Sequence, residues 1–231
     1  SHTSALSGGA WSPDNTRILT TSYDGTARIW DATTGHHHLT LTSHTDRLTS
    51  GAWSPDGTRI LTTSYDGTAR IWNATTGHHH LTLTSHTSPL TSGAWSPDGT
   101  RILTTSNDGT ARIWDATTGH HHLTLTLTGH TSWLTSGAWS PDGTRILTTS
   151  NDGTARIWDA TTGRPRGWRL EQLPDGELAL WSAGGDELLG ASDEAWRWLG
   201  WLVPRGGRLV RLPAETWGPL PPLPQPTAPM P

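Results

Sequence analysis

The sequence predicts an all-β protein made of repeated four-stranded antiparallel sheets. Residues 1–163 are near-copies with a period of 42 residues, and residues 43–84 and 85–126 differ at only four positions. Each copy consists of short segments separated by turn sequences, which is typical of strands. The one change of length, Leu127 and Thr128, extends the segment LTLTLT by an even number and so preserves the two alternating faces of a strand.

Residues 44–85 illustrate the four strands of one copy. Leu48 to Trp53 are predicted to form the first strand, and the turn SPDG follows, in which proline presets φ and glycine accepts a positive φ. Arg59 to Ser64 form the second strand, and Asp66-Gly67 makes a tight reversal into the third strand, TARIW. In TARIW, alanine and isoleucine share one face, and arginine and tryptophan share the other. The turn TTG then leads into the fourth strand, LTLT.

Composition limits the classes of function. The chain of 231 residues is long enough to bury a substantial core, and its 15 Trp with no Phe indicate a fold that reuses one aromatic residue. The lack of Cys excludes disulfides, thiolate metal sites and a cysteine nucleophile. The basic residues are all arginine, the net charge is -4, and the basic residues are not clustered into a stripe along the sequence. We therefore expect no nucleic-acid partner.

Location and source are expected from weaker signals. Since the sequence has no long apolar run and no signal-like start, we expect a cytoplasmic protein that does not contact a membrane. The use of arginine to the exclusion of lysine, together with abundant alanine, glycine and proline, suggests a bacterial source.

Four strands every 42 residues, with GAWSPD and a tryptophan that ends TARIW in each copy, closely resemble the WD-repeat family of β-propellers. The resemblance covers residues 1–163 and implies four propeller blades. In that family a histidine before the first strand bonds to a serine, an aspartate and the indole of the tryptophan. The tetrads at the matching positions are His2, Ser22, Asp24 and Trp30; His44, Ser64, Asp66 and Trp72; His86, Ser106, Asp108 and Trp114; and His130, Ser150, Asp152 and Trp158.

Two departures from the family pattern fall in surface turns. The glycine that usually precedes the histidine is Ser43 and Ser85 in two copies, and Gly129 keeps it in another. Asn73 replaces the aspartate that follows the tryptophan.

A serine, a histidine and an aspartate that recur together also match a hydrolytic triad, in which histidine activates the serine. The trio recurs four times with a tryptophan donor attached, whereas an active site needs one exposed nucleophile beside an oxyanion hole. We therefore expect a structural role for the tetrads, and a protein without catalytic residues or cofactors.

Three histidine triplets are the unusual feature: His36 to His38, His78 to His80 and His120 to His122. Imidazoles bind zinc, copper and nickel. Along a strand, however, two residues of each triplet point to one side, and no carboxylate or thiol lies nearby in the sequence to complete a zinc site. We expect solvated outer-strand residues with no resident metal and with weak, adventitious binding of nickel.

The copies differ mainly in two loops, the loop with the tetrad histidine and the Asp-Gly hairpin turn, which lie on one face in the WD family. Arginine, tyrosine and tryptophan are the residue types that anchor interfaces. We predict a protein or peptide partner on this face, although drift of unconstrained loops would give the same pattern. A lectin-like propeller that binds carbohydrate or a small ligand is the alternative. The predicted partner-binding residues are Tyr23, Asp46, Arg47, Tyr65 and Trp133.

The repeats stop after Gly163. Residues 164–217 lack the tetrad signature, and their segments ELALW, ELLGAS, WRWLGWLV and RLVRL are predicted as the strands of a diverged fifth blade that closes the propeller. That blade is expected to contact the first blade through residues 175–213.

This part of the chain is also similar to the ends of large bacterial repeat proteins with signalling or protease domains. The resemblance implies the sensor part of a larger signalling or defence protein. Residues 218–231 are rich in proline and are predicted as a flexible tail, since proline cannot join a sheet ladder.

Overall fold

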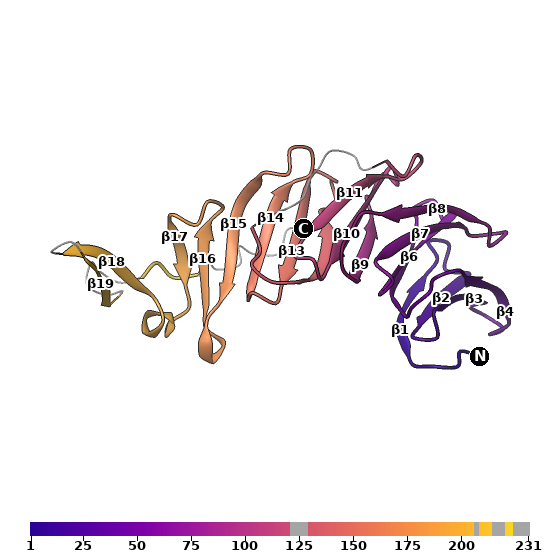
Figure 1. The fold of residues 1–231 in the computed structure, drawn as a ribbon, viewed down its shortest axis with the longest axis horizontal. Helices are drawn as coiled ribbons and strands as arrows, with labels where there is room; N and C mark the ends of the chain where they lie inside the picture. The colour runs from indigo at the N-terminus through magenta and orange to yellow at the C-terminus, as the bar shows by residue number, and fades with distance from the viewer. Residues whose placement is uncertain (121–128, 206–207, 214–219, 224–231) are drawn as a thin grey trace. The chain divides into compact units, whose positions relative to one another are not determined.

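The computed structural model describes residues 1–120, 129–205, 208–213 and 220–223 (Figure 1). The chain divides into two compact units, and each is described by itself. Unit 1 contains Ser1–Asp152 and Trp158–Arg164, and unit 2 contains Gly153–Ile157 and Pro165–Pro231. In the described part of the chain, no helix has the length and apolarity needed to cross a bilayer.

The sheets of unit 1 follow the sequence repeats, which we number repeat 1 (residues 1–42), repeat 2 (43–84), repeat 3 (85–128) and repeat 4 (129–163). Sheet 1 contains the antiparallel strands β1 (Leu6–Trp11), β2 (Arg17–Ser22), β3 (Thr26–Asp31) and β4 (His37–Thr42), in this order. Sheet 2 contains, in the same way, β5 (Leu48–Trp53), β6 (Arg59–Ser64), β7 (Thr68–Asn73) and β8 (His79–Thr84). The all-β prediction is confirmed here; β5 and β6 have the predicted limits, whereas β7 extends one residue beyond TARIW to Asn73 and β8 begins at His79, before the predicted LTLT.

Repeats 3 and 4 continue the pattern. Sheet 3 contains β9 (Leu90–Trp95), β10 (Arg101–Ser106) and β11 (Ala111–Asp115). Its expected fourth strand, with the inserted Leu127 and Thr128, lies outside the described residues. Repeat 4 contains β12 (Leu134–Trp139) paired with β13 (Arg145–Ser150), followed by β14 (Thr154–Asp159), within which the boundary of the two units falls.

The turns form for the reasons that the sequence indicates. Between β5 and β6, Gly57 has a φ of 69° and donates its N–H to the carbonyl of Ser54 at 2.9 Å. Asp56 accepts hydrogen bonds from the Ser54 hydroxyl at 2.5 Å and from the Thr58 N–H at 3.0 Å. The carboxylate therefore satisfies the turn's polar groups, while the glycine supplies the left-handed conformation.

Each sheet has two different faces, because successive side chains of a strand point to opposite sides. In sheet 2, one face carries Leu61 of β6 with Ala69 and Ile71 of β7, and we call this side of each sheet the leucine face. The other carries Ile60 of β6 and Trp72 of β7, which are cross-strand partners, and we call it the tryptophan face.

The core lies between the sheets, where the leucine face of one repeat packs against the tryptophan face of the next. The strand β5 accordingly contacts both β1 and β9, and β9 also contacts β12. The cluster between repeats 1 and 2 contains Leu19, Ala27, Ile29 and Leu41 from the first and Leu48, Trp53, Ile60, Trp72 and Ala74 from the second. The corresponding residues form the clusters between repeats 2 and 3 and between repeats 3 and 4.

A glycine permits the close approach of these faces. A Cβ atom at Gly93 of β9 would lie 2.7 Å from Cγ2 of Thr63 and 2.9 Å from Cδ2 of Leu61, both buried in repeat 2. Gly51 and Gly137 have the same surroundings in their own repeats. Gly9, the equivalent residue of repeat 1, has no such neighbour: the nearest atom to its Cβ position is the Leu19 carbonyl oxygen, 3.6 Å away.

In unit 2, β15 (Pro165–Gln172) pairs with β16 (Leu178–Ser182), and β16 pairs with β17 (Leu188–Ala191). The strands β18 (Gly200–Arg205) and β19 (Arg208–Pro213) form a separate two-stranded sheet. The two 3₁₀ turns of this region are η1 (Pro174–Gly176) and η2 (Ala195–Arg197).

This arrangement differs from the single four-stranded fifth blade expected at residues 164–217. The segment WRWLGWLV was expected to form one strand, but it begins within the 3₁₀ turn η2, and β18 starts only at Gly200. The Asp-Gly reversal that sets this hairpin in the repeats is absent here, which removes the local signal for one continuous sheet. Closure of the propeller through residues 175–213 stays a prediction.

A short part of the predicted tail lies along β17. Pro222 forms a parallel bridge with Ala191 of β17. Ala191 donates its N–H to the Pro221 carbonyl at 2.7 Å and accepts the N–H of Leu223 at 3.2 Å. Proline lacks only the donor, so this segment joins the edge through the Pro221 carbonyl and the Leu223 N–H. The remaining tail residues, 218, 219 and 224–231, lie outside the described part.

Candidate functional site

A buried hydrogen-bond network links the loop before β5 to sheet 2. His44 Nδ1 donates to Asp66 Oδ2 at 2.8 Å, and His44 Nε2 lies 2.9 Å from the hydroxyl of Thr62. Trp72 Nε1 donates to the same hydroxyl at 2.8 Å. When the imidazole is neutral, Nε2 is an acceptor, so Thr62 donates to His44 while it accepts from Trp72.

The same network recurs in the other three repeats. The corresponding bonds are between 2.8 and 3.0 Å long, and the histidine and aspartate side chains are almost completely buried. Each network ties the loop before a sheet to that sheet's second and third strands. The members are His2, Thr20, Asp24 and Trp30; His86, Thr104, Asp108 and Trp114; and His130, Thr148, Asp152 and Trp158.

The predicted role of the serine in each tetrad is wrong. A threonine, not the serine, bonds to the histidine and to the tryptophan. Ser64 Oγ lies 2.9 Å from the Arg47 carbonyl oxygen and 3.1 Å from that of Asp46, and it accepts the N–H of Asp66 at 3.1 Å. Serine thus closes the loop and the turn through backbone groups. The other serines with this role are Ser22, Ser106 and Ser150.

The register of the strands explains why the threonine is chosen. Thr62 and Ser64 share a face of β6, because they are two residues apart. Trp72 is paired with Ile60, so Thr62 is its diagonal neighbour, whereas Ser64 lies one step further along the strand. The hairpin register could have identified Thr62 from the sequence.

Hydrogen bonds keep the network aspartates ionised. Burial alone would raise the pKa of Asp66, but hydrogen bonds from His44 and Thr68 outweigh burial and hold that pKa well below its ordinary value. Burial and the same kinds of hydrogen bond act on Asp24 and Asp108, and both carboxyls likewise have lowered pKa values.

We expect the free energy of unfolding to decrease as the pH falls below about 4. A carboxyl whose pKa is lower in the folded state stabilises the protein fully above its unfolded pKa of about 3.9, and this contribution is lost as the pH falls through the folded pKa. Urea unfolding between about pH 2 and 7 measures the slope. The variant Asp66→Asn should have a shallower slope than the parent chain, and equal slopes would contradict the assignment.

Three of the five predicted partner-binding residues form a stack. Arg47 lies in the loop before β5, and its Cζ is 3.8 Å from the ring centroid of Tyr65 and 5.7 Å from that of Tyr23. These distances are typical of cation–π contacts. Arg47 and Tyr23 are exposed, and the exposed Asp46 accepts the N–H of Arg47 at 2.7 Å. The sequence indicated the residue types, and the structure adds that they contact one another.

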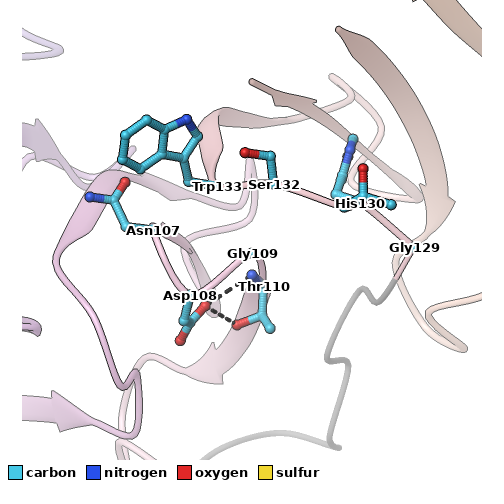
Figure 2. Close-up of a pocket in the computed structure, with 9 residues that line it drawn as sticks. Asn107, Asp108, Gly109, Thr110, Gly129, His130, Ser132 and Trp133 are labelled. Carbon is cyan, nitrogen blue, oxygen red and sulfur yellow. Dashed lines mark hydrogen bonds between the residues drawn. The ribbon is translucent and has the colours of Figure 1, made fainter. Parts of the chain in front are cut away.

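A hollow of about 340 Å³ lies where the β10–β11 turn meets the loop before β12. Trp133, the fifth predicted residue, lines it and is exposed. Figure 2 shows Trp133 and Asn107 toward one end of the lining and Gly129 at the other. The sequence positions of Asn107 and Trp133 correspond to Tyr65 and Arg47 in repeat 2, so the face is not symmetric.

The described histidines of the three triplets are exposed, with one difference from the expectation of fully solvated side chains. The middle histidines, His37 and His79, pack edge-on against Trp30 and Trp72, at centroid distances of 5.3 and 5.4 Å. Burial, and then the nearby Arg70, lower the pKa of His79. His121 and His122 lie outside the described residues. Among those that are described, no group of three histidine or carboxylate side chains could hold a metal.

The geometry of repeats 1 to 4 agrees with a comparison to known families. The family model of the TolB beta propeller domain (PD40) matches residues 3–163, more than half of the chain and almost the whole of the four repeats. The chain belongs to the TolB β-propeller family. Sheets 1 and 2 are accordingly four-stranded blades of a TolB-type propeller, and repeats 3 and 4 are further blade units of the same kind.

The TolB-type repeats are related to WD repeats but are a distinct family, so the resemblance inferred from the motifs is correct at the level of the propeller blade. Membership of the WD family itself stays a prediction. The matched region contains the four hydrogen-bond networks, the Tyr23–Arg47–Tyr65 stack and the hollow beside Trp133. A comparison with curated proteins finds no match.

Proposed function

We propose that this TolB-type propeller is a non-catalytic interaction scaffold that binds a protein or peptide through the face carrying Tyr23, Arg47, Tyr65 and Trp133. The observation that carries the proposal is the stack of Arg47 against Tyr65 and Tyr23 on an exposed loop face. A guanidinium held between two rings has already lost much of its rotational freedom, so binding through it costs less entropy.

The hollow beside Trp133 complements this stack. Tryptophan buries a large area at low entropic cost, and a cavity of about 340 Å³ has room for a large side chain of a partner. The amide residue Asn107 lines the same hollow, whereas the Asp108 carboxylate is held in the buried network by His86 and Thr110. The face therefore offers an aromatic and cationic patch in repeats 1 and 2, and an aromatic cavity with an amide in repeats 3 and 4.

A role in binding rather than catalysis is supported by the hydrogen bonds of the serines. A serine nucleophile needs its hydroxyl exposed and in contact with a histidine. Ser22, Ser64, Ser106 and Ser150 are instead buried and bond to backbone groups.

The finer features of the proposal rest on the sequence and on the networks. A WD-type blade is supported by the bonded histidine, aspartate and tryptophan in all four repeats. A cytoplasmic bacterial protein, without a membrane or nucleic-acid partner and serving as the sensor part of a larger signalling or defence protein, is the setting that we propose.

A lectin-like function is the second candidate, favoured by one observation. Exposed Trp133 stands with Asn107 beside one hollow, and an aromatic face beside an amide suits the stacking and hydrogen bonding of a sugar. A binding site of this kind would use Trp133 without Arg47 or the two tyrosines. The two candidates therefore differ in the residues on which binding depends.

Selection of peptides from a displayed random library on the immobilised chain tests the proposal. For the selected peptides, the combined variant Arg47→Ala, Tyr65→Ala and Trp133→Ala should weaken binding by at least about tenfold, because hot-spot residues cost about 2 kcal/mol or more each when truncated. The affinity is measured by calorimetry.

The matched control removes three exposed side chains from another part of the repeats: His36→Ala, His78→Ala and His120→Ala. This variant should bind the peptides like the parent chain. Loss of binding in the control with retention in the loop-face variant would show that the wrong surface was chosen. Binding of glycans that depends on Trp133 alone, without any selected peptide, would favour the lectin-like candidate.

A further inference from the structure

The strand β17 of unit 2 has a neighbour on each of its two edges. On one edge it pairs with β16. On the other edge lies the segment of residues 220–223, whose sequence is Leu-Pro-Pro-Leu. Ala191 donates its N–H to the Pro221 carbonyl at 2.7 Å and accepts the Leu223 N–H at 3.2 Å, and Pro222 stands opposite Ala191. The segment is therefore added to the sheet as a short parallel strand.

This pairing suits a segment that is rich in proline. Proline has no N–H, so it joins a sheet only where no donor is required of it. In this bridge Pro221 supplies a carbonyl, and the N–H donor comes from Leu223. The edge of β17 thus requires an acceptor and, two residues later, a donor, and the two positions before the donor are open to proline.

The side chains of the segment differ in burial in a regular way. Leu220 and Leu223 are half-buried, whereas the two prolines between them are exposed. A polyproline II helix has about three residues per turn, so residues three positions apart lie on the same side of it. The leucines therefore supply the apolar contact, while the prolines keep the segment extended and reduce the entropy lost on binding.

The edge of β17 is adapted to a close backbone neighbour at Gly190. A Cβ atom there would lie 2.7 Å from the Pro222 carbonyl oxygen and 3.1 Å from Cα of Leu223, and the three nearest atoms all belong to the backbone of the segment. Backbone atoms cannot turn aside as the end of a flexible side chain can. The φ of Gly190 is outside the left-handed region, so the missing side chain serves the approach of the segment and not a turn.

We propose that the edge of β17 is a docking site for extended, proline-rich peptides of the Leu-Pro-Pro-Leu type, and that residues 220–223 occupy it in cis. A peptide of a partner takes the place of this segment, with one carbonyl on the Ala191 N–H and a leucine N–H on the Ala191 carbonyl. The site is built from residues of unit 2 and uses none of the loop-face residues, so it adds a second kind of binding to the proposed function.

The nature of the contact favours exchange with another chain. Recognition by strand addition depends on main-chain hydrogen bonds and a few side-chain contacts, so any peptide with the same pattern makes the same bonds. The segment is held by two backbone hydrogen bonds and two half-buried leucines, which is a small contact. Its advantage is the tether, because tethered segments reach effective concentrations on the order of 1 mM. A peptide at higher concentration, or with further contacts, replaces it.

Two variants separate the segment from the edge that binds it. Leu223→Pro removes the donor that the segment gives to Ala191 and leaves β17 unchanged, so the edge should become free. Gly190→Ala places a methyl group against the backbone of the segment, so the edge should lose its own segment and be closed to any other. Leu220→Pro is the matched control, since the Leu220 N–H bonds to no group within the described residues.

The probe is a synthetic peptide with the sequence of residues 218–226, added to the isotope-labelled 231-residue chain and followed through the NMR signals of the β17 amides. The Leu223→Pro chain should bind it at least about threefold more tightly than the parent, in which the tethered segment competes. The Gly190→Ala chain should bind it at least about tenfold more weakly than the Leu223→Pro chain. The Leu220→Pro chain should bind it like the parent.

Hydrogen exchange of the Ala191 amide measures the cis contact without added peptide. Exchange should be slow in the parent and in Leu220→Pro, and at least about tenfold faster in Leu223→Pro and Gly190→Ala, because the acceptor at Pro221 is withdrawn. Circular dichroism establishes that each variant is folded. If Gly190→Ala fails to fold, the two leucine variants decide the question by themselves.

Three results would overturn the proposal. The first is a Leu223→Pro chain that releases the Ala191 amide and still binds no peptide, since the segment would then only close a sheet edge within its own chain. The second is a folded Gly190→Ala chain that binds the peptide as tightly as Leu223→Pro does. The third is equal exchange of the Ala191 amide in the parent and in Leu223→Pro.

Discussion

Replacing Thr62 by valine is expected to lower the free energy of unfolding by about 2 to 4 kcal/mol, although the two side chains have nearly the same shape. The hydroxyl of Thr62 is bonded both to His44 Nε2, at 2.9 Å, and to Trp72 Nε1, at 2.8 Å. Valine would leave both ring nitrogens buried without a partner, and each such group costs about 1 to 3 kcal/mol.

Urea unfolding of the Thr62→Val variant measures this cost. The matched control is Thr84→Val, in the same sheet but exposed at the end of β8, where the change should alter stability by less than about 0.5 kcal/mol. Equal stabilities of the two variants would contradict a central role for Thr62. The same experiment with Ser64→Ala separates the loop-closing serine from the network.

The second large effect is expected from a single added methyl group. Gly93→Ala should destabilise the protein by about 1 to 3 kcal/mol, because the new Cβ atom would lie 2.7 Å from Thr63 and 2.9 Å from Leu61. Neither side chain can move away easily: both are buried, and the Thr63 hydroxyl lies 2.7 Å from those of Thr49 and Ser50.

Gly9→Ala is the control, since the chain offers the same glycine in the same strand position without a repeat packed on it. There the methyl group would lie 3.6 Å from the Leu19 carbonyl oxygen, an ordinary van der Waals contact, and the reduced freedom of the unfolded chain should stabilise the protein by up to about 1 kcal/mol. Thermal melts at low protein concentration compare the two variants. If Gly9→Ala is as harmful as Gly93→Ala, crowding at the interface is not the cause.

Much of the architecture could be predicted from the sequence because the same local signals occur four times. Turns such as Ser54 to Gly57, and the reversal at Asp66-Gly67, fix strand ends through φ preferences and side-chain hydrogen bonds, which act over a few residues. The predicted strands Leu48 to Trp53 and Arg59 to Ser64 match β5 and β6 to the residue. Local chemistry was sufficient to place these two strands and the turns between them.

The errors arise where the outcome depends on contacts between strands. Whether Thr62 or Ser64 bonds to His44 depends on the position of Trp72 in the neighbouring strand, which composition alone does not give. In unit 2 the segment expected to begin a strand at Trp196 begins in a 3₁₀ turn, and no reversal signal indicates where β18 starts. The pairing of Pro222 with Ala191 depends on an open sheet edge more than 30 residues away in the sequence.

The candidate site was only partly predictable for the same reason. Residue types indicated Tyr23, Arg47 and Tyr65, because arginine and aromatic side chains recur in interfaces. Their stacking depends on the distance between the turns of neighbouring repeats, which follows from the packing of whole sheets. The hollow beside Trp133 likewise lies next to Asn107, which is smaller than the tyrosine at the equivalent position of repeats 1 and 2. The sequence alone does not predict the size of this hollow.

The uniform interface between repeats also bears on how such a chain can change in evolution. Duplication or deletion of one 42-residue period would leave every internal junction with the same leucine, glycine, tryptophan and arginine contacts as before. The number of repeats can therefore vary by recombination between near-identical segments, without any compensating substitution in the core. Sequence divergence is then free to accumulate in the loops that carry Tyr23, Arg47 and Trp133, so that the number of repeats and the loop sequences can evolve separately.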